Sequence, residues 1–363
     1  MTGKGEIGPP VLIRRKGAAG IISLNRPRAL HALNLAMVRA MSAALLEWAR
    51  DPGVAVVIID HAGDQGGDAK LSRGFCAGGD IAMLRQSALE DGGAAARDFF
   101  FEEYRLNDLL YAYPRPVVAF MDGITMGGGV GISQPARYRV ATVNTRLAMP
   151  ESGIGLFPDV GGGWYLSRLS GRLGPYLALT GARLTGADCL WAGLASHHLP
   201  VGALAQAKAR LVDGEAPGRV LGNLCDQPEE APITAGLIHI LRHFSKPTLE
   251  AIIASLAADD SDWARATLAT LRTKSPTTCK VALRQMADSL RLSSFAQNMA
   301  MEYRIAARVV MLPDFAEGVR AVILDKDNAP RWTPATPEGV TDEMIAAIFA
   351  PLPPEQEWSP YEL

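Results

Sequence analysis

The sequence lacks any hydrophobic stretch long enough to cross a bilayer, because its longest apolar runs, such as residues 54–59 and 116–120, are only a few residues long. It also carries little net charge, −2 at pH 7 over 363 residues, which gives no general attraction to nucleic acid or to anionic membrane. The first ten residues, MTGKGEIGPP, have neither the apolar centre of a signal peptide nor the Arg- and Ser-rich pattern of a mitochondrial presequence. We therefore expect a cytoplasmic globular protein with no nucleic-acid or membrane partner.

Cysteine is scarce, and its spacing excludes the common cysteine-based sites. The four residues have no CxxC spacing and are expected to be reduced, structural thiols: Cys76, Cys189, Cys225 and Cys279. Cys76, in RGFCAGGD, lies near a suspected site and is a candidate nucleophile, but no characteristic catalytic-cysteine signature surrounds it.

Several enzyme motifs are also missing. No G-x-S-x-G nucleophile motif occurs, since Ser133 stands in GISQP. His239 and His243 share a helix face, yet HILRH lacks the glutamate of H-E-x-x-H, so a surface or core role is expected for both. With no P-loop, EF-hand or zinc pattern, the sequence predicts neither a metal nor a redox cofactor.

Strand and helix patterns alternate through the first two hundred residues. Alternation over residues 11–25 predicts a hairpin around Lys16-Gly17, and apolar spacing over 33–50 predicts an amphipathic helix. A buried strand at 54–60 leads through FCAGGD into a helix from Ile81, and a strand at 116–120 leads through a glycine cluster into another. Strands followed by helices in series predict an α/β fold with sites at strand ends.

The character of the sequence changes after residue 203. Six segments there have helical composition and period, at 204–212, 232–242, 248–256, 262–273, 276–290 and 295–310. The proline-rich end is expected to wrap on the surface, with one helix at 341–349, and His197-His198 reads as a strand or turn between the parts. We divide the chain into a core (1–203), a helical part (204–332) and a tail (333–363).

Two glycine loops are the strongest indication of chemistry. Gly127, Gly128, Gly129 and Gly131 stand between a strand and a helix, where they could form a tight turn, a nucleotide fingerprint or an oxyanion hole. The acidic residue required by the nucleotide fingerprint is absent from its expected place. A second loop of the same kind, at 75–80, could supply a second N–H to the same oxygen, as a tetrahedral oxyanion requires.

Acidic residues stand on both sides of the glycine loop at 127–131. Glu151 comes directly after a strand, where it could be a catalytic acid, a surface turn residue or a helix cap. Asp159, before Val160-Gly161-Gly162-Gly163, could also be a helix N-cap. Glu102 and Glu103 are adjacent on a helical segment and point to different faces, so at most one of them can enter a shared pocket.

Taken together and in order, LNRPRALHALN, SRGFCAGGDI, AFMDGITMGGGVG, AMPE and DFAEGVRA resemble the crotonase (enoyl-CoA hydratase/isomerase) superfamily from about residue 11 to 330. The longer AMPESGIGLFPDVGGGWYLSRL, SPTTCKVALRQ and DFAEGVRAVILDKDNAPRW are similar to its branch of 3-hydroxyisobutyryl-CoA hydrolases. The resemblance implies an α/β (α+β) spiral of ββα units, a helical C-terminal region used in homo-oligomerisation, and an acyl-CoA substrate without a separate cofactor.

The resemblance also implies roles for individual residues. The N–H groups of Gly79 and Gly128 would hold the thioester oxygen, Glu151 would be the catalytic acid and Asp159 its partner. Glu103 and the backbone of Ala77 would contact substrate, with the CoA adenine along 29–32. Candidate basic residues for the CoA phosphates are Arg26, Arg28, Lys70 and Arg73.

One departure separates the activities of this superfamily. Enoyl-CoA hydratases have a catalytic glutamate three residues after the second oxyanion glycine, and this chain has Gly131 there. They also carry a small residue where this chain has Asp159. The pattern therefore favours thioester hydrolysis, with an enoyl-CoA isomerase or hydratase, or a non-catalytic acyl-CoA-binding protein, as the alternatives.

Overall fold

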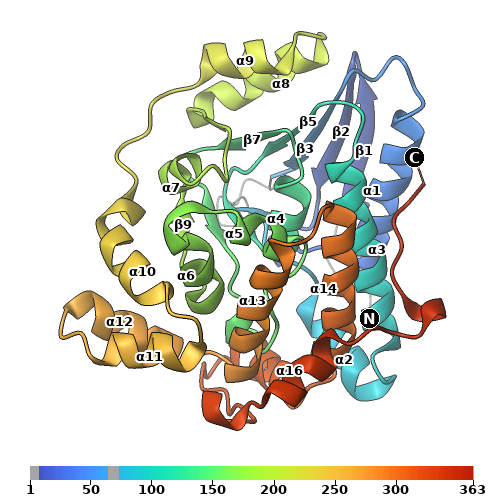
Figure 1. The fold of residues 1–363 in the computed structure, drawn as a ribbon. Coiled ribbons are helices and arrows are strands. Elements are labelled where there is room, and N and C mark those ends of the chain that lie inside the picture. Colours follow the sequence, from blue (N-terminus) through green and yellow to red (C-terminus); the bar gives the residue numbers. More distant parts are fainter. Residues whose placement is uncertain (1–7, 64–72, 363) are drawn as a thin grey trace.

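The computed structural model describes residues 8–63 and 73–362, whose strands form two sheets surrounded by helices (Figure 1). The larger sheet has the order β1 (Val11–Lys16), β2 (Ala19–Leu24), β3 (Val56–His61), β5 (Val117–Phe120), β7 (Tyr138–Ala141), β10 (His197–His198). The smaller has the order β4 (Gly74–Cys76), β6 (Ile124–Met126), β8 (Arg146–Ala148), β9 (Leu184–Thr185). From β2 to β10 and from β4 to β8 the neighbours are parallel.

Consecutive strands divide between the two sheets in a repeating way. Strands β3, β5 and β7 enter the larger sheet, and the strands that follow them, β4, β6 and β8, enter the smaller one. A helix follows each such pair: α2 (Ile81–Glu90), α4 (Gly128–Ser133) and, after a short turn, α5 (Gly162–Ser167). The predicted spiral of ββα units is confirmed, and it places the loop after every second strand on one side of the molecule.

The local predictions near the N-terminus are also confirmed. Strands β1 and β2 pair antiparallel with Val11 opposite Leu24 and Lys16 opposite Ala19. The helix expected at 33–50 is α1 (Leu35–Trp48), which begins where the Asn34 side chain accepts the N–H of Met37. Every residue of β3 from Val56 to Asp60 is buried, as a strand covered on both faces should be.

Helix α3 (Ala94–Tyr111) is the longest helix of the described chain and carries a site residue into the interior. It packs against α1 and against α14 (Phe295–Val309), where Phe101 and Tyr104 of α3 meet Tyr303 of α14 edge to face. Glu103 is 2% exposed, whereas its neighbour Glu102 faces outward and accepts a hydrogen bond from the Tyr361 hydroxyl at 2.8 Å. The prediction that only one of the two acids faces inward is confirmed.

All described strands precede residue 199, and the later elements are helices, of which α9 and α15 were not predicted and the others lie at or near the predicted positions. They are α8 (Leu204–Val212), α9 (Pro217–Leu224), α10 (Leu237–Phe244), α11 (Leu249–Ala257), α12 (Asp262–Leu271), α13 (Pro276–Ser289), α14, α15 (Pro313–Val319) and α16 (Asp342–Phe349). Earlier in the chain lie α6 (Leu173–Thr180) and α7 (Gly186–Trp191). Helices α8 and α9 pack on one face of the larger sheet, while α13 and α14 contribute to the main core with α1 and α3 (Figure 1). The division at residue 203 stays a prediction.

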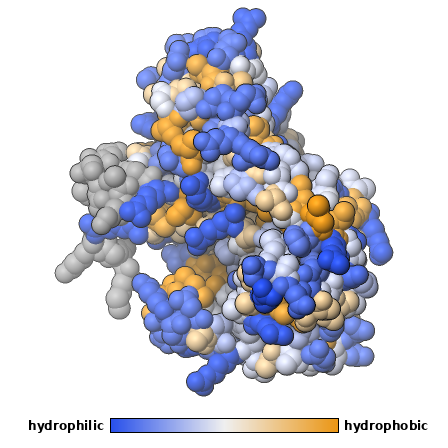
Figure 2. All heavy atoms as spheres, turned by 90° about the vertical axis from the view of Figure 1, so that its left-hand side faces the viewer, coloured by the Kyte–Doolittle hydropathy of each residue, from blue (hydrophilic) through white to orange (hydrophobic). Residues whose placement is uncertain are grey.

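Helices α10, α11 and α12 form the side of the molecule seen in Figure 2, where hydrophobic atoms gather in separate patches between hydrophilic ones. Ile238 and Leu241 of α10 are 82% and 54% exposed.

Within residues 8–63 and 73–362, no helix combines the length and the apolar character that a membrane span requires. Homo-oligomerisation through the helical region stays a prediction.

Candidate active site

A cavity of about 560 Å³ opens at the ends of the strands of the smaller sheet. All six residues predicted to act on or contact the substrate line it: Ala77, Gly79, Glu103, Gly128, Glu151 and Asp159. They come from the two glycine loops, from α3, and from the segment that follows β8. The fold therefore brings together residues that lie up to 82 positions apart in the sequence.

The two glycine loops touch each other. A Cβ atom on Gly127 would lie 3.4 Å from the Gly78 Cα, and one on Gly128 would lie 3.3 Å from the Gly78 carbonyl carbon. Gly127 and Gly78 have φ angles of 46° and 119°, which side chains strongly disfavour. This close approach is the reason that both loops need glycine.

Two N–H groups face the space between the loops. Gly128 is the first residue of α4, so its N–H has no acceptor within the helix. Gly79 forms a single parallel bridge in which Leu33 donates to Gly78 and Asp80 donates to Leu33, which directs the Gly79 N–H to the opposite side. Their role as an oxyanion hole stays a prediction.

Glu151 begins a short 3-10 helix, η2 (Glu151–Ile154), and its carboxyl group is inside the protein. The residue is 5% exposed, its Oε2 atom is buried without a hydrogen-bond partner, and Oε1 lies 3.1 Å from the place of a Cβ on Gly127. Burial, followed by the charge of Asp159, raises the pKa of Glu151 well above its ordinary value. Burial excludes the surface-turn alternative, and the capping alternative does not apply because the N-cap residue of η2 is Pro150.

Asp159 is also buried, at 4% exposure, and accepts a hydrogen bond of 2.9 Å from the Tyr104 hydroxyl. Burial raises its pKa to about 7, although the Tyr104 hydroxyl opposes this shift by favouring the charged form. The N-cap of α5 is Gly161, so Asp159 does not have the capping role that the sequence left open.

Glu103 points at the start of α4 from the other side. Its Oε1 atom is buried without a partner and lies 2.7 Å from the place of a Cβ on Gly128. Burial, followed by the charge of Asp159, raises the pKa of Glu103 well above its ordinary value. Three acids thus share one cavity, and the charge of Asp159 opposes ionisation of the other two.

Glu302 of α14 supports this site and was not predicted. It is fully buried and accepts hydrogen bonds from the N–H groups of Gly161 at 2.7 Å and Gly163 at 3.0 Å. The side-chain amides of Asn298 and Gln285 donate to it at 2.8 and 2.9 Å. Burial raises the pKa of Glu302 to about 8 in spite of these donors. Glu302 fixes the glycine turn directly after Asp159. This role could not be predicted from the sequence, because it depends on a contact between distant parts of the chain.

Gly131 has no room for a side chain. A Cβ there would lie 2.6 Å from the Val160 Cβ and 2.9 Å from the Asn107 amide nitrogen. Values below 3.0 Å require something to move, so a glutamate at this position would displace the wall that carries Asp159. The packing around position 131 therefore requires glycine, the residue that stands here in place of the hydratase glutamate.

The segment at 29–32, expected to contact adenine, lies against the glycine loop at 75–80. The N–H of Ala77 donates to the carbonyl of Leu30 at 3.0 Å, and Arg26 donates to the carbonyl of Ala32 at 2.7 Å. Arg73 is exposed, and Lys70 lies outside the described residues. The roles of this segment, and of Arg26, Arg28 and Arg73, in CoA binding stay predictions.

Cys76 does not have the environment of a nucleophile. It is fully buried, burial raises its pKa to about 12, and its sulfur contacts the carbonyl of Gly78 at 3.6 Å. His61, the nearest histidine in sequence, packs against His31 at 5.2 Å between ring centroids. The cavity chemistry therefore rests on carboxyl groups.

The histidine pair on α10 faces a third possible ligand, Asp259. Both imidazole rings pack on Trp263, and ligand atoms of the three residues lie within 4.8 Å of one another. Asp259 is already bonded by His243 and Arg242, each at 3.1 Å, and by the N–H of Ser261 at 2.9 Å. These contacts favour the core role predicted for His243, and the expectation of no metal stays a prediction.

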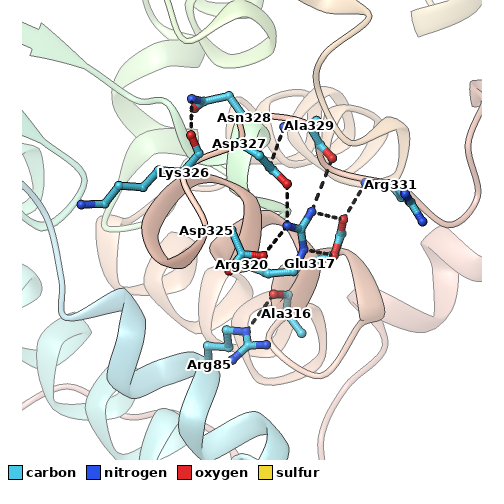
Figure 3. Close-up of polar contacts among 10 residues, drawn as sticks. All are labelled: Arg85, Ala316, Glu317, Arg320, Asp325, Lys326, Asp327, Asn328, Ala329 and Arg331. Atoms are coloured by element: carbon cyan, nitrogen blue, oxygen red, sulfur yellow. Dashed lines mark hydrogen bonds and ion pairs between the residues drawn. The ribbon is translucent and has the colours of Figure 1, made fainter.

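A C-terminal segment lines one side of the cavity, and Figure 3 shows the polar contacts that hold this segment. Val322 and Ile323 of the π-helix η6 (Arg320–Leu324) line the cavity, as do Asn328 and Pro330 after it. Arg320 holds the segment in place, bonding Glu317 at 2.8 Å, Asp325 at 2.6 Å and Asp327 at 2.7 Å. The same Glu317 accepts the N–H of Arg331 at 2.9 Å, so both ends of the loop meet at one ion pair.

Replacing Arg320 by Gln should raise KM for the acyl-CoA substrate predicted from the sequence several-fold and leave kcat within about twofold, because it loosens a wall of the cavity and leaves the acids in place. Steady-state kinetics of free-thiol release would measure both constants. Arg291→Gln, at an exposed arginine whose carboxylate contact is 3.9 Å long, is the matched control. A fall in kcat with unchanged KM would contradict this account of Arg320.

Comparison with known proteins shows the class to which this site belongs. The chain belongs to the enoyl-CoA hydratase/isomerase family, whose sequence model matches residues 19–349. The predicted superfamily and its fold are confirmed.

Particular relatives narrow the comparison. The chain is 40% identical to the mitochondrial 3-hydroxyisobutyryl-CoA hydrolase of Gallus gallus and 42% identical to that of Xenopus tropicalis. Each alignment covers 94% of this chain and 89% of the relative. A crystal structure titled as a carnitinyl-CoA dehydratase from Mycobacterium thermoresistibile is 38% identical, with a TM-score of 0.89 over 96% of this chain and 98% of that one.

The expectation of a cytoplasmic setting is wrong on this comparison, because these hydrolase relatives are named as mitochondrial proteins. It rested on the composition of the first ten residues alone, a part of the chain that holds no site residue.

Proposed function

We propose that the protein hydrolyses the thioester of 3-hydroxyisobutyryl-CoA, a step of valine degradation, to give 3-hydroxyisobutyrate and CoA. The observation that carries the proposal is the pair of buried acids, Glu151 and Asp159, beside two converging N–H groups. The hydrolase relatives, similar over almost the whole chain, support the same substrate.

The thioester oxygen would accept hydrogen bonds from the N–H groups of Gly79 and Gly128. Both donors belong to the backbone, so they would be in place before substrate arrives and would stabilise the negative charge that develops on the oxygen when the carbonyl is attacked. Loss of one such donor typically costs about 3 kcal/mol of transition-state stabilisation. No cofactor besides the CoA of the substrate is required.

Glu151 would supply the base or the nucleophile. As general base it would take a proton from water, whose oxygen attacks the carbonyl carbon while the carbon–sulfur bond breaks and the CoA sulfur leaves, taking up a proton. As nucleophile its carboxylate would attack the same carbon, giving a mixed anhydride that water then cleaves. Asp159 would orient the water or tune Glu151, and Glu103 would hold the substrate hydroxyl or the water.

Hydration of a double bond is the second candidate, since a related structure is titled as a dehydratase. Hydration in this superfamily uses a second glutamate at the place of Gly131, and the contacts of Gly131 with Val160 and Asn107 leave no space for it. The packing therefore supports hydrolysis.

The deciding experiment follows free thiol released from 3-hydroxyisobutyryl-CoA with a thiol reagent, and follows the acyl products by mass spectrometry. Thiol release with equal formation of the free acid would support the proposal. Hydration or double-bond migration of an enoyl-CoA without thiol release would overturn it in favour of the second candidate. Tight acyl-CoA binding without any turnover would indicate a binding protein.

The pH dependence tests the coupling between the acids. Activity of the wild-type protein should rise with pH as the acids lose their protons, since burial raises the pKa of Asp159 to about 7 and the pKa of Glu151 well above its ordinary value. Because the charge of Asp159 raises the pKa of Glu151, Asp159→Asn should shift the acidic limb of the residual kcat/KM to lower pH. Glu102→Gln, on the outer face of α3, serves as control and should leave the profile unchanged. A limb that stays at the wild-type pH in Asp159→Asn would contradict the coupling.

A further inference from the structure

Two cationic side chains line the cavity, Arg183 and Lys274, and neither has a role in the mechanism above. Over the described part of the chain, neither side chain makes a hydrogen bond or an ion pair. Arg183 is exposed, whereas Lys274 is partly buried, and burial lowers its pKa below the ordinary value. An ammonium group that has lost water without gaining an acidic partner is costly in a folded protein.

Lys274 is placed beside the loop that carries Glu151. A Cβ on Gly153, two residues after Glu151, would lie 3.3 Å from the Lys274 Nζ atom. Glycine at this position therefore leaves the space that the ammonium group occupies. Gly153 belongs to the short helix η2 that Glu151 begins, and Glu151, Gly153 and Lys274 all line the cavity.

The backbone around Lys274 is tied down on both sides. Thr273 accepts a hydrogen bond from the Trp332 indole at 3.0 Å, and the N–H of Ser275 donates to the carbonyl of Ser152 in η2 at 3.0 Å. The Ser275 hydroxyl also donates to Asp314 at 2.6 Å. These bonds link Lys274 directly to the 3-10 helix of Glu151, so the lysine stem leaves a fixed point of the fold.

Thioester hydrolysis produces an anion that can pair with the Lys274 ammonium group. Hydrolysis turns a neutral thioester and water into a carboxylate, a thiol and a proton. The carboxylate forms in a cavity with three buried acids, two of which, Glu103 and Glu151, have pKa values well above the ordinary range because burial disfavours their charge. A second anion in this place needs a nearby positive charge, and Lys274 is a cation fixed next to the Glu151 loop.

We propose that Lys274 binds the carboxylate of the released acid, and so makes the product-bound state accessible in an otherwise acidic cavity. This inference rests on the proposed function for the origin of the acid. CoA phosphates share the anionic oxygen chemistry, but the CoA phosphate end is highly charged and belongs at the exposed mouth of the cavity. Lys274 therefore acts on the acid half of the products.

The test compares inhibition of thiol release by 3-hydroxyisobutyrate and by free CoA in wild type, Lys274→Met and Lys274→Arg. In Lys274→Met the inhibition constant for the acid should rise at least tenfold, while that for CoA stays within twofold. Lys274→Arg keeps the charge and should stay within about threefold of wild type for the acid. Lys246→Met, at an exposed lysine outside the cavity, is the matched control.

Two results would overturn the proposal: an unchanged inhibition constant for the acid in Lys274→Met, or a tenfold rise for CoA alone, which would assign Lys274 to the phosphates. Calorimetric titration of the acid into wild type and Lys274→Met gives a second measurement that needs no turnover. Absence of thiol release by wild type would refute the proposed function, while loss of acid binding in Lys274→Met would still support the lysine assignment. Absence of acid binding by wild type would refute the assignment itself.

Discussion

Glu151→Gln should lower kcat for thioester hydrolysis by about 10³-fold and leave the protein folded, because glutamine keeps the shape of the side chain but can neither accept a proton nor attack a carbonyl. Binding of the acyl-CoA should persist, since the N–H groups of Gly79 and Gly128 come from the backbone. Single-turnover measurements of thiol release, with binding measured separately, would distinguish the two effects.

The same variant should gain stability relative to wild type as the pH rises. The pKa of Glu151 in the folded protein lies above its unfolded value of about 4.3, so the folded protein holds this proton more tightly than the unfolded chain does. The wild-type free energy of unfolding therefore falls as the pH rises from about 4 toward the folded pKa, and a glutamine is free of this loss. The difference in Tm between variant and wild type should be larger at pH 8 than at pH 5.

Glu102→Gln is the control for this pair of effects, because Glu102 is the acid on the outer face of α3, bonded to Tyr361. It should change neither kcat nor the pH dependence of Tm appreciably. If Glu151→Gln retained more than a tenth of the wild-type kcat, Glu151 would be neither base nor nucleophile. If its Tm followed the wild-type pH dependence, burial of an ionisable group at this position would not limit stability.

The sequence predicted the elements of the fold well where the pattern was local. The alternation in β1 and β2, the apolar run of β3 and the period of α8, α13 and α14 each depend on residues close together in the chain, and the structure confirms them. The glycine loops could be identified for the same reason. Their glycines are needed at positive φ and at close backbone contact, and both requirements act at single positions.

Other parts of the site could not be predicted because they depend on long-range contacts. Glu302 lies 141 positions after Gly161 and reads as one more acid on an amphipathic helix. Lys274 stands in a turn, and only the bond between Ser275 and Ser152 shows that it faces η2. For Glu151 and Asp159 the local pattern also fitted a turn acid or a cap, and burial alone separated these alternatives.

Glu302→Ala should lower the free energy of unfolding by about 4 kcal/mol, the largest loss of stability that we expect from a single substitution near the site. The change removes an acceptor from Gly161, Gly163 and the two amides, of which only that of Gln285 keeps another strong acceptor, the Pro158 carbonyl. Each buried donor left without a partner costs about 1–3 kcal/mol before relaxation. Denaturant unfolding would measure the loss, with Glu47→Ala at an exposed position of α1 as control.

Glu302→Ala should also affect catalysis, because the turn that it holds begins two residues after Asp159. A looser turn places Asp159 less well against Tyr104 and Glu151, so kcat should fall more than KM rises, and the acidic limb of the pH profile should move because the coupling changes. A role limited to stability predicts an unchanged pH profile in the fraction that remains folded. Unchanged stability and an unchanged profile together would mean that the turn after Asp159 keeps its shape without the carboxylate, and Glu302 would then have no positioning role.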